Sequence, residues 1–276
     1  MKKGKSILAN VYWLSSSNLI TKLIWILCTL ILMRELGPEG YGLFVLMLSA
    51  ATLAAPFTDL GISLALTRDG ARNPNIIRHY VSLVFRIKIL LSLLLWIILS
   101  AVYYNTTDLG PYAQGYWGLV LVVAILGVPL IDHFHTVMTS VLQINQRLDI
   151  FSKYRIAMFV GVLSLFVWLP YLNHNKLLYV ALVYFGMTLL FVLFYLRKTT
   201  NFIPAHEGES PPFNTVVASG SSFLILVLLS LALFRVDVIV ISIFGSIDQA
   251  GIYGAFYQGV FLFFMVASVL FSVLFP

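Results

Sequence analysis

The sequence predicts an all-α, polytopic membrane protein with about eight transmembrane helices, and both its composition and the length of its apolar runs favour this fold class. Hydrophobic residues make up 60% of the 276 residues and charged residues only 10%, whereas about a quarter of the residues in a soluble domain are charged. So few polar side chains cannot cover a surface that faces water. The apolar runs are about 20 residues long and do not alternate with period two, which excludes a membrane β-barrel.

Eight apolar segments reach the length of about 20 helical residues that a hydrocarbon core of about 30 Å requires. Short polar breaks rich in turn-forming residues separate the segments, and the longest break contains three prolines. We therefore expect residues 1–198 to form an N-terminal six-helix lobe, 199–215 a cytoplasmic linker, and 216–276 the first two helices of an incomplete second lobe. The predicted segments are 12–33, 41–64, 81–104, 115–138, 155–172, 177–196, 216–244 and 251–275.

The distribution of Lys and Arg predicts a cytoplasmic N-terminus, because short cytoplasmic loops retain these residues during insertion. With the N-terminus inside, eleven cations fall in inside segments and two, Arg34 and Lys176, in outside loops. Arg86 and Lys88, early in the third segment, are expected to snorkel to the inside face. This distribution explains the net charge of +6, and we expect no nucleic-acid partner. The inside cations are Lys2, Lys3, Lys5, Arg68, Arg72, Arg78, Arg147, Lys153, Arg155, Arg197 and Lys198.

Two stretches of the sequence look alike and predict an internal repeat. In each, a cation inside an apolar helix precedes a Gly-containing acidic turn and a Tyr-Gly-x-Phe sequence that opens the next helix. The cation Lys22 lies 19 residues before Tyr41, and the cation Arg235 lies 18 residues before Tyr253. Both helices would run from inside to outside. A parallel repeat of this kind is a construction principle of secondary transporters, whose substrate site lies between the halves.

Lys22 and Arg235 lie near the middle of their predicted helices, where a charge costs about 2.5–3.5 kcal/mol on insertion scales. Phosphate groups would pair with such cations, and Arg can hold a phosphate through two parallel hydrogen bonds. The alternative is a structural ion pair, but Arg235 and Asp237 are two residues apart and cannot face one another on a helix. We interpret Lys22 and Arg235 as substrate-binding residues.

Four further residues are candidates for a gate or for ion coupling: Asp59, Asp237, Asp132 and His135. Asp59 follows the kink expected at Pro56, and an interfacial cap is the alternative role for its carboxylate. Asp132 and His135 are three residues apart on one helical face, so protonation could couple them. The alternative is that both residues simply lie near the inner membrane interface and take no part in coupling.

The sequence carries no signal for enzyme chemistry. It contains no P-loop, no Gly-x-Ser-x-Gly, no His-Glu-x-x-His and no soluble stretch long enough for a nucleotide-binding domain. Cys28 is the one cysteine, so there is no disulfide and no Cys-based metal site. His133 and His135 would point to opposite sides of a helix, which disfavours a shared metal. We predict that the protein is not an enzyme and has neither cofactor nor metal.

Four motifs, in order and spacing, resemble the polysaccharide transporter family, which includes Wzx-type O-antigen flippases. This family lies within the multidrug/oligosaccharidyl-lipid/polysaccharide exporter superfamily, and the resemblance covers essentially the whole chain. The motifs are Arg34-Glu35-Leu36-Gly37-Pro38-Glu39-Gly40-Tyr41-Gly42, then Asp59-Leu60-Gly61-Ile62 leading to Thr67-Arg68-Asp69, then Arg235-x-Asp237 followed by Gly251-Ile252-Tyr253, and finally Leu274-Phe275-Pro276.

The resemblance implies a two-lobed flippase of twelve or more helices, of which this chain corresponds to the front part. Such a protein moves undecaprenyl-pyrophosphate-linked O-antigen or other polysaccharide repeat units from the inner to the outer leaflet of the bacterial inner membrane by alternating access. Lys22 and Arg235 would then be cavity cations. The implied partners are a lipid-linked oligosaccharide and membrane lipids, with a polysaccharide polymerase and a chain-length regulator of lipopolysaccharide as further candidates.

Two other functions stay open. A multidrug cation antiporter on the same scaffold would need acidic residues at midplane depth in the first lobe, where the sequence has Lys22. A membrane-embedded polysaccharide polymerase or acyltransferase would need catalytic residues on sizeable outer loops, and the outer loops here are short.

Overall fold

The computed structural model describes residues 7–58, 60–106, 116–204 and 212–274, and every secondary-structure element over these residues is a helix. The predicted all-α class is confirmed. In chain order the elements are α1 (Ile7–Ala54), η1 (Ala55–Thr58), α2 (Ile62–Arg72), η2 (Pro74–Ile76), α3 (Ile77–Thr106), α4 (Tyr116–Asp132), α5 (His135–Ile144), α6 (Leu148–Phe166), η4 (Leu169–Tyr171), α7 (Lys176–Thr199), η5 (Thr200–Phe202), α8 (Phe213–Phe244) and α9 (Ile247–Leu274).

Helix α1 contains the first predicted segment and most of the second as two arms. The arms meet at Gly37, whose φ of 71° and ψ of 175° are not helical, and Pro38 follows at once. The second arm ends at Ala54, and η1 begins with the dipeptide that contains Pro56, where a kink was expected. The fourth predicted segment is divided between α4 and α5, while the other predicted segments overlap α3, α6, α7, α8 and α9.

Four helical stretches of the described chain are long and apolar enough to cross a membrane: Pro74–Asn105, Gly118–Ile144, Leu148–Tyr171 and Lys176–Phe202. Most of α3 is not covered by protein, because large aliphatic side chains such as Leu90 and Ile97 are more than two-thirds exposed. A row of exposed aliphatic residues on a long helix is typical of a surface that faces lipid. These features are consistent with a multi-pass membrane protein.

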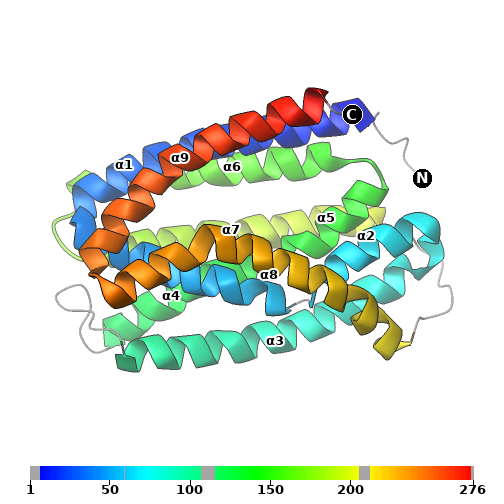
Figure 1. Cartoon of the computed structure of the whole chain (residues 1–276), viewed down its shortest axis with the longest axis horizontal. Coiled ribbons are helices and arrows are strands. Elements are labelled where there is room, and N and C mark those ends of the chain that lie inside the picture. The colour runs from blue at the N-terminus through cyan, green and yellow to red at the C-terminus, as the bar shows by residue number, and fades with distance from the viewer. Residues whose placement is uncertain (1–6, 59, 107–115, 205–211, 275–276) are drawn as a thin grey trace.

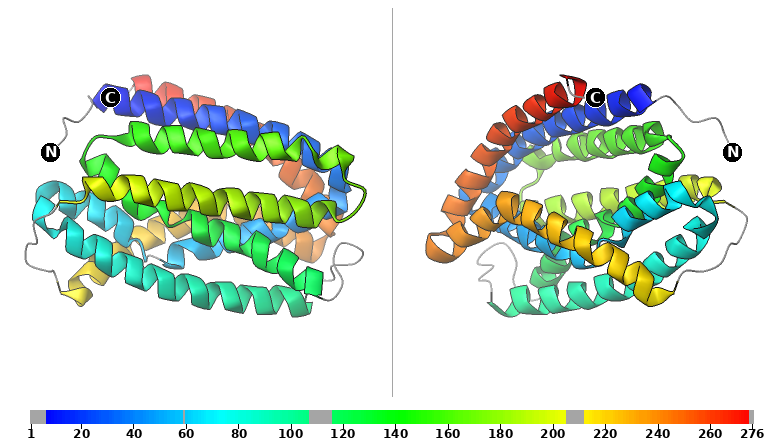
Figure 2. Two further views of the ribbon diagram at one scale, coloured as in Figure 1. Left: turned by 180° about the vertical axis from the view of Figure 1, so that it is seen from behind. Right: turned by 45° about the vertical axis from the view of Figure 1, so that its right-hand side comes forward.

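The helices form an elongated bundle in which segments from both ends of the chain lie side by side. Figure 1 shows α9 running along the first arm of α1, so that the start of α1 and the end of α9 lie at the same end of the bundle. Helix α1 packs most extensively on α9 and then on α6. The view from behind shows α6 and α7 on the side of the bundle opposite α8 and α9 (Figure 2). Helix α8 crosses the bundle and packs against α2.

Buried apolar side chains form two clusters. The first contains Cys28, Tyr41 and Leu121, and the second contains Ile62 and Val141. Helix α8 reaches both clusters, since its Val216 belongs to the second and its Val238 to the first. Trp25 and Tyr184 pack against both clusters, and the region around these two aromatic side chains lies between them.

Two close approaches between glycines bring α8 and α9 against α1 and α2. At the first crossing, a Cβ added to Gly42 would lie 2.1 Å from the carbonyl oxygen of Ile247, and a Cβ added to Gly251 would lie 2.1 Å from that of Pro38. At the second crossing, a Cβ added to Gly61 would lie 2.4 Å from the carbonyl oxygen of Gly220. Only glycine permits backbones to approach this closely.

Candidate functional site

A cavity of about 480 Å³ lies where α1, the α4–α5 junction, α6, α7, α8 and α9 meet, and we call it the charged cavity. Its volume is within the range of about 300–1,000 Å³ that is usual for ligand pockets. Aromatic, hydroxyl and charged side chains share its wall. The lining residues are Asn18, Thr21, Lys22, Trp25, Tyr41, Val45, Leu48, Thr52, Ala55, Pro56, Val128, Pro129, Asp132, His133, His135, Arg155, Phe159, Tyr184, Val227 and Gln258.

Lys22 reaches the charged cavity from the first arm of α1. Its Nζ donates a hydrogen bond to Gln258 Oε1 of α9 at 2.5 Å and lies 4.4 Å from the centre of the Phe261 ring. The amide acceptor is neutral and leaves the positive charge of the ammonium group in place. An aromatic face also attracts a cation. The contact between the first and the last helix of the chain therefore has a cation at its centre.

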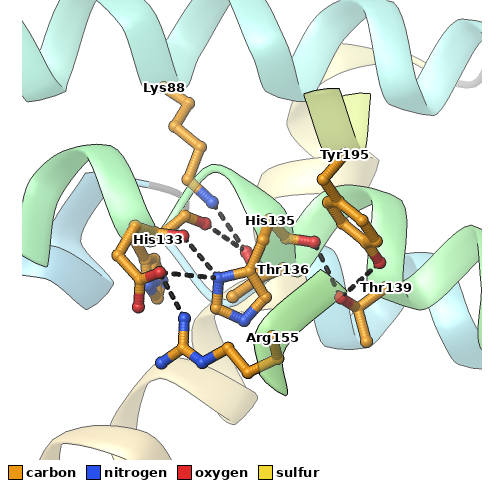
Figure 3. Close-up of polar contacts among 8 residues, drawn as sticks. Lys88, His133, His135, Thr136, Thr139, Arg155 and Tyr195 are labelled. Carbon is orange, nitrogen blue, oxygen red and sulfur yellow. Dashed lines mark hydrogen bonds and ion pairs between the residues drawn. The ribbon is translucent and has the colours of Figure 1, made fainter. Parts of the chain in front are cut away.

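A second cation comes from α6. Arg155 Nη1 donates to Asp132 Oδ1 at 2.5 Å (Figure 3). The same guanidinium lies 5.2 Å from the centre of the Phe159 ring. His135 Nδ1 is 3.7 Å from Asp132 Oδ1, and it also contacts the carbonyl oxygen of Asp132. Arg155 and Asp132 form one ion pair, so the charged side chains that line the cavity are two cations and one carboxylate.

Lys88 lies beside the group formed by Arg155, Asp132 and His135, and its position differs from the one expected from the sequence. Its side chain is 0% exposed, and its Nζ donates to Thr136 Oγ1 at 2.8 Å (Figure 3). The predicted snorkelling of Lys88 to the inside face is wrong, because the residue lies on the side of α3 that packs against α5. Arg86, two residues earlier, is exposed.

The break between α4 and α5 corrects a second expectation. His133 and His135 were predicted to point to opposite sides of one helix, but α4 ends at Asp132 and α5 begins at His135. The turn between the two helices brings both imidazoles to the wall of the charged cavity. Among the residues that the structure describes, no group of three or more His, Cys, Asp or Glu side chains could hold a metal ion.

The remaining predicted site residues lie outside the charged cavity or outside the described chain. Asp237 of α8 accepts a hydrogen bond from Tyr253 Oη of α9 at 2.5 Å and does not line the cavity. Asp59 lies outside the described residues. Arg235 lies in α8, but its side chain is outside the described part of the structure. Of the six predicted residues, the structure therefore brings Lys22, Asp132 and His135 to one cavity.

The sequence profile of one family, described as polysaccharide biosynthesis protein, matches residues 7–276. The chain belongs to the polysaccharide biosynthesis protein family. The family resemblance that was drawn from the motifs around Gly37, Gly61 and Gly251 is thereby confirmed. No curated protein sequence matches the chain.

Two solved structures share the fold of this family member. One, called protein A, has a TM-score of 0.66 at 15% identity, over 94% of this chain and 62% of that chain. The other is a MOP superfamily transporter from Pyrococcus furiosus, with a TM-score of 0.61 at 14% identity, over 96% of this chain and 63% of that one. That transporter is described as having a binding pocket of reverse polarity that suggests a different function. The chain spans less than two thirds of the length of either structure.

Sequence reasoning missed several residues that line the cavity of this polysaccharide biosynthesis family member. Asn18, Thr21 and Trp25 follow one another at spacings of three and four residues, and Lys22 lies four residues after Asn18 and three before Trp25. That polar stripe inside an apolar segment is a signal that predicts a cavity-facing surface. Arg155 was counted only among the inside cations, since it stands at the predicted start of its segment. Gln258 carries no such signal, because it is an uncharged residue within an apolar stretch of α9.

Proposed function

We propose that the protein is a flippase that moves undecaprenyl-pyrophosphate-linked O-antigen or other polysaccharide repeat units from the inner to the outer leaflet of the bacterial inner membrane by alternating access. The observation that carries this proposal is the charged cavity, in which Lys22 meets Gln258 across the contact of α1 with α9. Membership in the polysaccharide biosynthesis protein family supports the choice of a sugar-bearing substrate.

The charge of the cavity favours an anionic ligand. Its lining includes Lys22 and Arg155 against one carboxylate, Asp132. A guanidinium forms bidentate hydrogen bonds with phosphate, and a low-dielectric surrounding strengthens such a contact. We therefore assign the pyrophosphate to Lys22 and Arg155, and we keep Arg235 as the further predicted substrate-binding cation on α8.

We also propose the arrangement in the membrane on which this function depends. About eight helices cross the bacterial inner membrane with the N-terminus in the cytoplasm, as the distribution of Lys and Arg indicates. Residues 1–198 form a six-helix lobe, 199–215 a cytoplasmic linker and 216–276 the first two helices of a second lobe. The substrate site then lies between the two lobes. A polysaccharide polymerase and a chain-length regulator remain candidate partners.

Asp132 and His135 are the candidates for a gate or for ion coupling that the contacts support best. Both lie beside Arg155, so a change in the protonation of either group alters the charge next to a proposed phosphate-binding cation. Asp237 joins α8 to α9 through Tyr253, and its role as a gate, like that of Asp59, stays a prediction.

Binding of farnesyl pyrophosphate, a short-chain analogue of the lipid carrier, tests the anion site in the detergent-purified chain. Lys22→Gln keeps a polar side chain and removes the charge, and we expect it to weaken binding about ten- to hundredfold, as the loss of a charged hydrogen bond predicts. Lys153→Gln is the matched control, because Lys153 is exposed and contacts the Trp13 ring outside the cavity. Equal affinities for wild type and Lys22→Gln would reject the proposal.

The main alternative is a multidrug cation antiporter, and Asp132 is the observation in its favour, since it places an acid in the cavity. The net charge of the lining weighs against this alternative, because Lys22 adds a positive charge that the ion pair of Asp132 with Arg155 does not neutralise. Binding of a lipophilic cation such as tetraphenylphosphonium, with no binding of farnesyl pyrophosphate, would favour the antiporter. We propose no enzymatic activity.

A further inference from the structure

A second cavity of about 280 Å³ adjoins the charged cavity, and we call it the neutral chamber. Pro56, His133, His135 and Val227 line both spaces, so the two cavities share a wall. The neutral chamber lies between α2, α5 and α8. Its other lining residues are Gly61, Ser63, Leu64, Thr136, Thr139, Ser140, Gln143 and Leu224.

The chemistry of the neutral chamber differs from that of its neighbour. Four hydroxyl groups, one amide and two imidazoles line it, and the described lining contains no Asp, Glu, Lys or Arg. The charged cavity, on the other side of the shared wall, contains Lys22, Arg155 and Asp132. A ligand that fits both spaces would have a charged part joined to a neutral part rich in hydroxyl groups.

The hydroxyl groups of the chamber are held in place by the backbone. Ser140 Oγ donates to the carbonyl oxygen of Ser63 at 2.6 Å, and Thr139 Oγ1 donates to that of His135 at 2.8 Å. A hydroxyl oxygen that donates its proton still has two lone pairs. Tyr195 Oη lies 3.0 Å from Thr139 Oγ1 and takes one lone pair of Thr139, which leaves the other to accept a hydrogen bond from a ligand hydroxyl. Gln143 is exposed and adds an amide that can both donate and accept.

Apolar side chains complete the wall of the chamber. Leu64 of α2 and Leu224 of α8 line the chamber together with the polar groups of α5. A sugar ring has the same division, with C–H groups on its faces and hydroxyl groups around its edge. The volume lies just below the usual range of about 300–1,000 Å³, which fits a small ring system better than a whole oligosaccharide.

We propose that the neutral chamber binds the sugar residue next to the pyrophosphate, while the charged cavity holds the pyrophosphate itself. This inference rests on the proposed function and adds to it a specific place for the sugar. His133 and His135, in the shared wall, then stand at the bond that joins sugar to phosphate. Selectivity for the first sugar of the repeat unit comes from Gln143 and Thr139.

Two soluble probes separate the sugar from the anion: farnesyl pyrophosphate, and farnesyl pyrophosphate with a terminal N-acetylglucosamine. Titration calorimetry of the detergent-purified chain measures both affinities. We expect the wild type to bind the sugar-bearing probe more tightly, and Gln143→Leu to reduce its affinity about three- to tenfold, the effect of one lost hydrogen bond. The affinity for farnesyl pyrophosphate stays unchanged in this variant, whereas Lys22→Gln weakens the binding of both probes.

Controls exclude effects of folding and of a general loss of polarity. Gln249→Leu makes the same chemical change at an exposed position of α9 outside both cavities, and it should leave both affinities unchanged. Thr139→Val supplies an independent change within the chamber. Equal wild-type affinities for the two probes, or a sugar contribution that survives both chamber variants, would overturn the inference while leaving the anion site intact. If neither probe binds, the proposed function fails, and the inference with it.

Discussion

The two glycine crossings that bring α8 and α9 against α1 and α2 differ in why each requires glycine. At the first crossing, neither Gly42 nor Gly251 has a positive φ, so the requirement there is for space alone. At the second crossing, Gly61 has a φ of 74° and also lies against the backbone of Gly220. Gly37 provides the third case, since its φ is 71° but nothing lies within 4 Å of an added Cβ. These three cases distinguish glycines that are required for close packing from glycines that are required for their backbone conformation.

The surroundings of the two crossings differ as well. Tyr41 and Ala250, next to the first crossing, are 0% exposed and belong to the first apolar cluster. Beside the second crossing, Leu60 has a φ of 52°, which is unusual for a residue other than glycine, and Gly61 lines the neutral chamber. The first crossing is thus a regular contact of packed helices, whereas the second is an irregular junction next to open space.

The largest effect is expected for Gly61→Ala. The substitution adds about 1–2 kcal/mol for a left-handed backbone and about 1–3 kcal/mol for overpacking, so the free energy of unfolding should fall by about 2–5 kcal/mol. Cys28 is fully buried and is the one cysteine of the chain, so its reaction with a fluorogenic maleimide on heating reports unfolding. Gly186→Ala is the control, because an added Cβ there meets nothing within 4 Å. Equal thermal midpoints in the two variants would contradict the inference that Gly61 is required both for its positive φ and for its close packing.

At the first crossing, Gly42→Ala and Gly251→Ala should each lower the free energy of unfolding by about 1–3 kcal/mol through overpacking. Because the two contacts are reciprocal, separating the helices at one glycine makes room at the other. The double variant should therefore cost less than the two single changes together. Gly259→Ala, also on α9 but with open space around an added Cβ, serves as the control in the same thermal assay. Additive effects would show that the two glycines do not share one contact.

Gly37→Ala isolates the conformational requirement. The combination of φ 71° and ψ 175° belongs to a region that is essentially restricted to glycine, so we expect a cost of about 1–3 kcal/mol with no contribution from contacts. Gly37→Asn should give no rescue, because Asn tolerates the ordinary left-handed region but not this one. A thermal midpoint equal to that of the wild type for either variant would argue that the break in α1 does not depend on Gly37.

The sequence predicts this fold well where long apolar runs determine it. Run length places α3, α6, α7, α8 and α9, because the backbone in lipid must satisfy its hydrogen bonds within each helix. It does not place α2, which begins at Ile62 where the second predicted segment ends. Breaks within a run are harder to predict. The division between α4 and α5 comes from a turn after Asp132 that follows Pro129, and composition alone does not locate the end of a helix after a proline.

The internal repeat stays a prediction, and its register shows a second limit of the sequence. The sequence aligns Tyr41 with Tyr253, whereas the reciprocal contact pairs Gly42 with Gly251, a shift of three positions. In the register of the contact, Lys22 matches Leu231, and Arg235 lies one helical turn further along α8. Short motifs rich in Gly and Tyr allow several alignments, so the sequence alone does not determine the register.

The candidate site was predictable in part. Lys22 stands out because a charge inside an apolar helix is costly, and the structure puts it in a cavity. Arg155 and Gln258 do not stand out, because one lies at the end of a predicted segment and the other is uncharged. Their place at the cavity depends on how α6 and α9 pack against α1, which is information that a single sequence does not contain.

The smallest effect concerns the ion pair beside the second crossing. Arg68 Nε donates to Asp69 Oδ1 at 2.7 Å, and this hydrogen bond holds the pKa of Asp69 below its usual value. A lowered pKa contributes stability at pH values above the unfolded-state pKa of about 3.9, and that contribution is lost as the pH falls through the folded-state pKa.

Because the ion pair of Arg68 with Asp69 is partly exposed, Asp69→Asn should lower the free energy of unfolding by less than about 1 kcal/mol near neutral pH. The thermal midpoint of the wild type should approach that of Asp69→Asn as the pH falls below about 4. A difference between wild type and Asp69→Asn that does not shrink as the pH falls below about 4 would mean that Asp69 stabilises the second crossing through packing and not through its charge.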